Sequence, residues 1–120
     1  MVTTEEKGTR LRIYRQGAVV VFQLGGPFTA EFLQRLDEAL EREIGNAVPR
    51  VVGDLAEVTL VDSAALEWLL DRQEGWRRSG GDLKLARPTE LVADILRITG
   101  LDTIVEIYDS VPRAVGSYAL

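Results

Sequence analysis

Short apolar runs typical of β-strands alternate with single amphipathic helices along most of this chain. Residues 18–24 are β-branched and almost wholly apolar, which suits a strand covered on both faces. Further apolar or alternating runs follow at residues 50–54, 82–86 and 103–108. Strands separated by single helices imply parallel βαβ crossovers. We therefore predict one α/β domain with a mostly parallel central sheet, in the order β-β-α-β-α-β-α-β-α.

The N-terminal part of the chain predicts a hairpin. Residues 11–13 alternate in polarity, and the Gln-Gly pair at residues 16–17 is a turn signal before the apolar run. We expect the first strand to lie antiparallel at the sheet edge, and the Gly-Gly-Pro at residues 25–27 to end the second. Residues 1–9 are expected to form a flexible segment, and residues 10–120 the folded domain.

The intervals between strands have the apolar period of helices. The first helix is predicted from its N-cap Thr29 to a stop at residues 45–46, with one apolar stripe formed by Phe32, Leu36, Leu40 and Ile44. A second helix begins at Asp62-Ser63 and carries Trp68 and Trp76, of which one is expected in the core. A third helix is expected to point Leu91, Ile95 and Ile98 toward the core. A terminal helix is expected to begin at Ser110.

Composition excludes several classes of function. The 120 residues include no cysteine and no histidine, which removes disulfides, Ser-His-Asp catalysis, cysteine nucleophiles and the usual zinc sites. The formal charge of −5 argues against nucleic-acid binding, because phosphate contacts need a basic excess. No apolar run reaches the roughly 20 residues of a membrane span. We expect a soluble, cytoplasmic protein without enzymatic activity, cofactor or metal.

Polar groups gather where a central strand leads into the second helix. Asp54, Glu57, Asp62 and Ser63 lie at or beyond the strand's carboxyl end, where open α/β sheets place their sites. Without histidine, nothing in the sequence makes Ser63 a nucleophile of its own. Ser63 is either a helix cap or a phosphate acceptor for a kinase. A phosphate there would be stabilised by the free N–H groups of the helix and destabilised by Asp62.

The stretch from residue 51 to residue 66, VVGDLAEVTLVDSAAL, resembles the signature of STAS domains in bacterial anti-sigma factor antagonists. The resemblance extends over roughly residues 10–120. It implies that Ser63 is phosphorylated by an anti-sigma factor that is itself a serine kinase, and that a phosphatase reverses this. The unphosphorylated form would bind the kinase and release the sigma factor. By position, the resemblance implies acidic neighbours at Asp54 and Asp62, to which the polar cluster adds Glu57. It also implies a partner-binding surface at the start of the second helix, at Ala64, Ala65, Glu67 and Trp68.

Three positions depart from the family pattern. Ala65 replaces a glycine, Glu67 replaces a small residue, and Thr29 replaces an acid, which together change the shape and charge of the docking surface. An alternative therefore stays open, namely a docking subunit of a lipid-transport ATPase or a stressosome-like scaffold, without phosphorylation. Trp68 could serve as an anchor in either case, or pack in the core. We expect a monomer or a weak dimer, with neither nucleic acid nor membrane insertion.

Overall fold

The computed structural model describes residues 2–6 and 8–119, with residues 1, 7 and 120 outside the description. Six strands form one sheet in sequence order. The first three, β1 (Val2–Glu6), β2 (Thr9–Gln16) and β3 (Val19–Phe28), pair antiparallel. From β3 onward the pairs are parallel, through β4 (Arg50–Val61), β5 (Asp82–Ala86) and β6 (Glu106–Tyr108). The mixed α/β sheet and the order of elements from residue 9 onward agree with the prediction.

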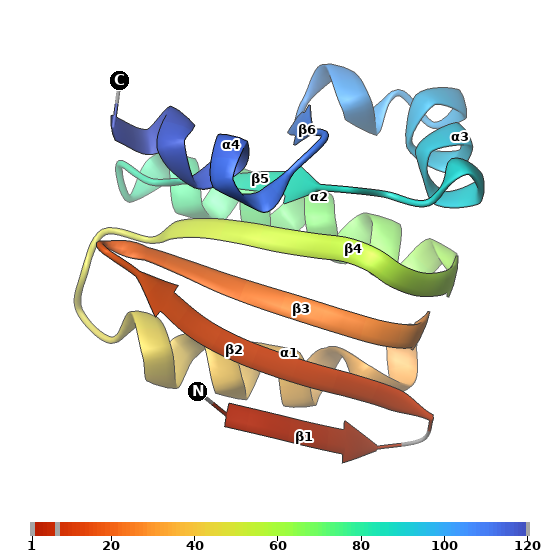
Figure 1. Ribbon diagram of the computed structural model, residues 1–120, viewed down its shortest axis with the longest axis horizontal. Helices are drawn as coiled ribbons and strands as arrows, with labels where there is room; N and C mark the ends of the chain where they lie inside the picture. Colours follow the sequence, from red (N-terminus) through yellow and green to blue (C-terminus); the bar gives the residue numbers. More distant parts are fainter. Residues whose placement is uncertain (1, 7, 120) are drawn as a thin grey trace.

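Helices cover both faces of this sheet unequally (Figure 1). On one face lie α1 (Ala30–Ile44), α2 (Ser63–Arg78) and α3 (Glu90–Ile98), and their apolar side chains form the main core with β2 to β5. The short α4 (Val111–Gly116) packs on the other face over a smaller apolar cluster. Because α4 is only six residues long, part of this second face stays uncovered.

The strands differ from the prediction at the sheet edge and in length. The edge strand is β1, which lies in the segment expected to be flexible, so β2 is an interior strand. β3 does not end at residues 25–27 but continues to Phe28, and β4 continues past Asp54 to Val61. Register shifts between β3 and β4 absorb the Gly-Gly-Pro sequence, and Gly26 takes φ +95, where a Cβ would meet the Gly8 carbonyl.

The helices begin near the predicted residues, but the prediction of which α3 residues face the core was wrong. Val92 and Leu96 are buried there, whereas Leu91 and Ile98 are exposed. Thr89 caps the helix by accepting a hydrogen bond from the Val92 N–H at 3.3 Å, and the helix packs Val92 and Leu96 into the main core. The predicted strand at residues 103–108 is shorter, because residues 101–103 form a 3-10 turn before β6. No helix among the described residues has the length and hydropathy to cross a membrane.

Candidate functional site

Ser63 is the first residue of α2, directly after the end of β4, and its side chain is exposed. The backbone N–H of Asp62 donates to the Phe28 carbonyl at 3.3 Å, which holds the ends of β3 and β4 together. The starts of α1 and α2, which follow these two strands, are therefore adjacent. No hydrogen bond of the Ser63 hydroxyl or of the Ser63 and Ala64 amides occurs with any described residue. The Ser63 hydroxyl and the first amides of α2 are thus both without a hydrogen-bond partner among the described residues.

One carboxylate caps both of these helices. Oδ1 of Asp62 accepts from the Ala65 N–H at 2.9 Å, and its Oδ2 accepts from the Ala30 N–H at 3.0 Å. Thr29, the predicted cap of α1, occupies the N-cap position, but its side chain makes no capping hydrogen bond. The N-cap of α2 is accordingly Asp62, and the Ser63 hydroxyl is free of that role. Asp62 thus links the N-terminus of α2 to the N-terminus of α1.

Asp54 and Glu57 are not brought to Ser63. Asp62 lies eight residues beyond Asp54 along an extended strand, which at about 3.3 Å per residue is roughly 26 Å. The Asp54 side chain is only 2% exposed and binds Arg87, with Nη2 to Oδ2 at 2.8 Å and Nε to Oδ1 at 3.2 Å. Glu57 is exposed and pairs with Arg10 of β2 at 2.9 Å. Of the three acidic residues expected near Ser63, only Asp62 is there.

Only part of the partner-binding surface predicted on α2 is accessible, and the rest is buried. Glu67 is exposed and Ala64 is half-buried, whereas Ala65 is fully buried. Trp68 is 6% exposed, and its indole N–H donates to Asp37 Oδ1 at 2.7 Å. This burial corrects the expectation that Trp68 lies on the docking surface. The accessible part of the start of α2 consists of Ser63, Ala64 and Glu67.

Trp68 is buried because α1 and α2 meet around its ring. Its ring stands edge-on to Phe22, Phe28 and Trp76, with centroids 5.9–6.2 Å apart. Arg72 lies over the ring at 5.8 Å and also forms a two-point ion pair with Asp37. The indole is thus in contact with both the apolar core and a charged pair at the helix–helix boundary.

Sequence reasoning missed Arg87, which follows β5. It has φ +55, in the left-handed region that residues other than glycine seldom adopt. Its hydrogen bond to the Asp54 carboxylate, and the charge of that group, raise the pKa of Arg87 further. Nearby, burial and then the charge of Asp54 raise the pKa of the Tyr14 hydroxyl, so that it stays protonated. No motif marks Arg87, and only its position after a strand and before Pro88 could have suggested a turn.

Among the described residues, no side chain forms a hydrogen bond with the Ser63 hydroxyl. A general base must lie within hydrogen-bond reach of the hydroxyl. The carboxylate next to Ser63, that of Asp62, is occupied by two backbone amides. Across the described residues there is also no group of three or more acidic, histidine or cysteine side chains placed to hold a metal ion.

Comparison with known proteins identifies the family. The STAS domain pattern matches residues 10–114, so the chain belongs to the STAS domain family. A Thermotoga maritima protein that carries the name anti-sigma factor antagonist is 37% identical over 60 residues, which are 50% of this chain and 53% of the relative. A Thermotoga neapolitana protein named as its homologue matches to the same extent. The matched region thus spans about half the length of these curated relatives.

Solved structures show the same fold over nearly the whole chain. The crystal structure of the Thermotoga maritima antagonist superposes with a TM-score of 0.80 at 24% identity, over 89% of this chain and 92% of that one. The anti-sigma factor antagonist SpoIIAA in its unphosphorylated form gives 0.76 at 14% identity, over 91% and 96%. Its phosphorylated form gives 0.69 at 14% identity, over 90% and 98%. At these identities the likeness establishes the fold.

Proposed function

We propose that this chain is a non-enzymatic anti-sigma factor antagonist whose binding to an anti-sigma factor with serine-kinase activity is switched by phosphorylation of Ser63. The observation that carries the proposal is the position of Ser63. It is an exposed serine at the first position of α2, immediately after the capping aspartate. The family assignment and the anti-sigma factor antagonists among its relatives support the same function. Such a role would place the chain in the cytoplasm.

The chemistry of the switch belongs to the kinase. The Ser63 Oγ would form a bond to the γ-phosphorus of ATP while the bond from that phosphorus to the β,γ-bridging oxygen breaks. ADP leaves, and the hydroxyl proton passes to a base of the kinase. A phosphatase would return the serine by hydrolysis of the phosphoester. This chain supplies an accessible hydroxyl on a rigid helix start.

Two opposing effects act on a phosphate at this position. The group adds a charge of about −1.5 to −2 and lies beside the unpaired amides of Ser63 and Ala64, which favours it. Asp62 already occupies the Ala65 amide with its own negative charge, and Glu67 is exposed one turn further along α2. Inside the domain the two effects offset in part. At an interface the added charge has no such compensation, so the phosphate would weaken binding without unfolding the domain.

The direct test is intact-mass analysis with site mapping of the protein purified from its native host. We expect a gain of one phosphate on Ser63 in part of the molecules. Binding to the cognate kinase should persist in Ser63→Ala and be lost in Ser63→Asp. Ser79→Asp is the matched control, because Ser79 is also exposed but is the C-cap at the other end of α2. The control should bind as the unmodified chain does.

A docking subunit without a phosphorylation cycle is the second candidate. The exposed Glu67 favours it, because an acid within a turn of Ser63 opposes the addition of a phosphate. Persistent absence of phosphate under stress and in stationary phase would support this candidate. Equal binding of the Ser63→Ala and Ser63→Asp variants to the kinase would refute the switch.

A further inference from the structure

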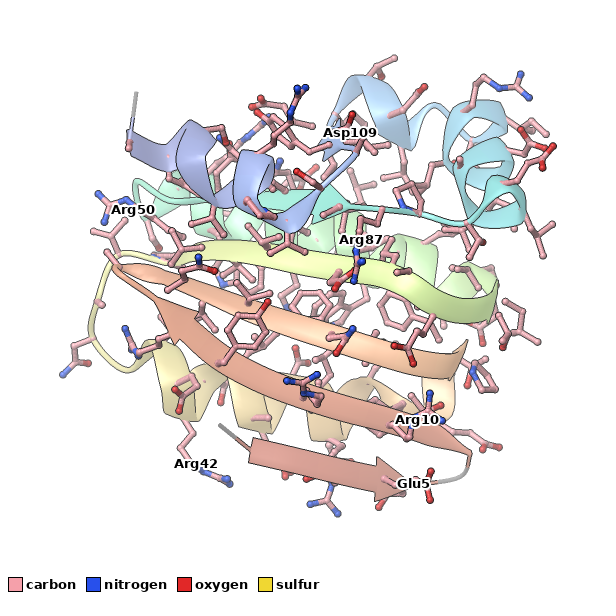
Figure 2. All side chains as sticks on the ribbon, in the orientation of Figure 1. Glu5, Arg10, Arg42, Arg50, Arg87 and Asp109 are labelled. Atoms are coloured by element: carbon pink, nitrogen blue, oxygen red, sulfur yellow. The ribbon has the colours of Figure 1, made fainter. Side chains whose placement is uncertain are left out.

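A groove of about 330 Å³ opens on the face of the sheet on which α4 packs. Its lining includes the side chains Arg12, Tyr14, Gln23, Asp54, Arg87 and Ser110. Figure 2 shows Arg10 and Arg87 on this same face, with α1 and α2 behind the sheet. The volume lies in the range of small-molecule sites, about 300–1,000 Å³. The groove is on the opposite face of the sheet from α2 and makes no use of Ser63.

The backbone leaves the extended conformation to place Arg87 in this groove. Side chains alternate along β5, with Ala86 on the α4 face, so an extended Arg87 would point to the opposite face. At φ +55 the strand breaks, and the guanidinium instead reaches Asp54 on the floor of the groove. Strained residues of this kind concentrate at functional sites. The conformation of Arg87 is thus a second, independent indication of a site.

Asp54 holds the guanidinium in one orientation. Its carboxylate is almost completely buried and binds Nε and Nη2 of Arg87, while it also accepts from Gln23 Nε2 at 3.3 Å and the Ala56 N–H at 3.2 Å. Four hydrogen bonds satisfy the carboxylate, so Asp54 serves to orient Arg87. A cation fixed in this way loses little conformational freedom when a ligand binds.

Arg87 retains donors that face the groove. A guanidinium has five N–H groups, and two of its nitrogens are engaged with Asp54. Its side chain is 45% exposed, and no other described residue accepts from it. Arg12 donates to Gln23 Oε1 at 3.2 Å in the same groove, and Tyr14 adds a neutral hydroxyl. The groove therefore presents several oriented donors to a ligand.

The arginine donors around the groove favour an anionic ligand. A second groove of about 220 Å³ adjoins the first, sharing Arg12 and Gln23, and adds Arg10 and Glu57. The two grooves together contain three guanidinium groups and two carboxylates, and both carboxylates are already paired with arginine. Planar, two-point recognition of carboxylate and phosphate is the usual role of such arginines.

From this arrangement we infer that the groove binds a small organic oxyanion, with its carboxylate or phosphate group on the outward N–H donors of Arg87 and beside Arg12. Asp54 is a positioning residue for this site. The ligand would bind on the face of the sheet opposite α2, so its binding can be measured independently of the Ser63 switch.

The test is a titration of the ¹⁵N-labelled chain, monitored by NMR at the backbone amides and the arginine side-chain Nε–H groups. Sodium phosphate and sodium acetate are the two probes, each compared with sodium chloride at equal ionic strength. We expect saturable shifts concentrated at Arg12, Gln23 and Arg87. Tighter binding of phosphate would assign a phosphorylated ligand, and equal or tighter binding of acetate a carboxylate ligand. Shifts no larger than with chloride would overturn the proposal.

Matched variants separate the site from general charge. Arg87→Lys keeps the charge but removes the two-point geometry, and it should weaken binding at least fivefold. Arg12→Gln leaves the Asp54–Arg87 pair intact, so it should fold normally and also weaken binding. Arg97→Gln is the control, because Arg97 is an exposed arginine of α3 that pairs with Asp94 far from the groove lining, and it should bind as the unmodified chain does. Equal binding by Arg12→Gln and the unmodified chain would refute the site even if Arg87→Lys fails to fold.

Discussion

Truncation of Trp68 to alanine should destabilise the domain severely. Replacement of a buried Trp by Ala costs about 3–5 kcal/mol. Here the ring is 6% exposed and makes three edge-to-face contacts, each of which adds about 0.5–1.5 kcal/mol beyond area burial. The lost hydrogen bond to Asp37 adds little, because that carboxylate keeps two hydrogen bonds from Arg72. We therefore expect a loss of about 4 kcal/mol.

The measurement is urea unfolding monitored by far-UV circular dichroism, a signal that does not depend on tryptophan fluorescence. At a slope of roughly 2 kcal/mol/M, a 4 kcal/mol loss lowers the midpoint by about 2 M. Trp68→Phe is the graded control, since it keeps an aromatic ring against Phe22 and Phe28 but lacks the indole N–H, and it should lose about 1–2 kcal/mol. A loss below about 1 kcal/mol for Trp68→Ala, with an unchanged slope, would show that the ring is outside the core. It would restore Trp68 as a candidate interface residue.

Two further predictions concern the helix caps and the C-terminal packing. Asp62→Ala removes the caps of both α1 and α2, at about 1 kcal/mol each, and should lower the free energy of unfolding by about 2 kcal/mol. Thr29→Ala should change it by less than about 0.5 kcal/mol, and equal losses for the two variants would disprove the double cap. Burial raises the pKa of Tyr118 above its ordinary 10.0, so the folded state keeps this proton at pH values where the unfolded state releases it. The stabilisation from Tyr118 is therefore complete below about pH 10 and declines above it. The urea midpoints of wild type and Tyr118→Phe should differ by a constant amount up to about pH 10 and approach each other between about pH 10 and 11. A difference that stays constant over this range would contradict the raised pKa.

Most of the fold could be predicted because its signals are local. Apolar β-branched runs, helical spacing and capping residues each act within a few positions, so the order of strands and helices from residue 9 onward follows from them. The same holds for Ser63, whose place at a strand-to-helix junction depends only on its neighbours in the chain. β1 escaped prediction, because residues 2–6 are held by pairing with β2, and their own sequence lacks an apolar pattern.

The tertiary structure decided how the site residues are distributed. Asp62 caps a helix 32 residues away because the ends of β3 and β4 meet, and Trp68 is buried because α1 brings Asp37 over it from 31 residues away. Asp54 is joined to Arg87, 33 residues along the chain, by a single left-handed residue that redirects a side chain across the sheet. The sequence by itself determined the family, the order of elements and the exposed serine. Which acidic group faces that serine, and the groove on the opposite face, depend on contacts between distant segments that local patterns do not encode.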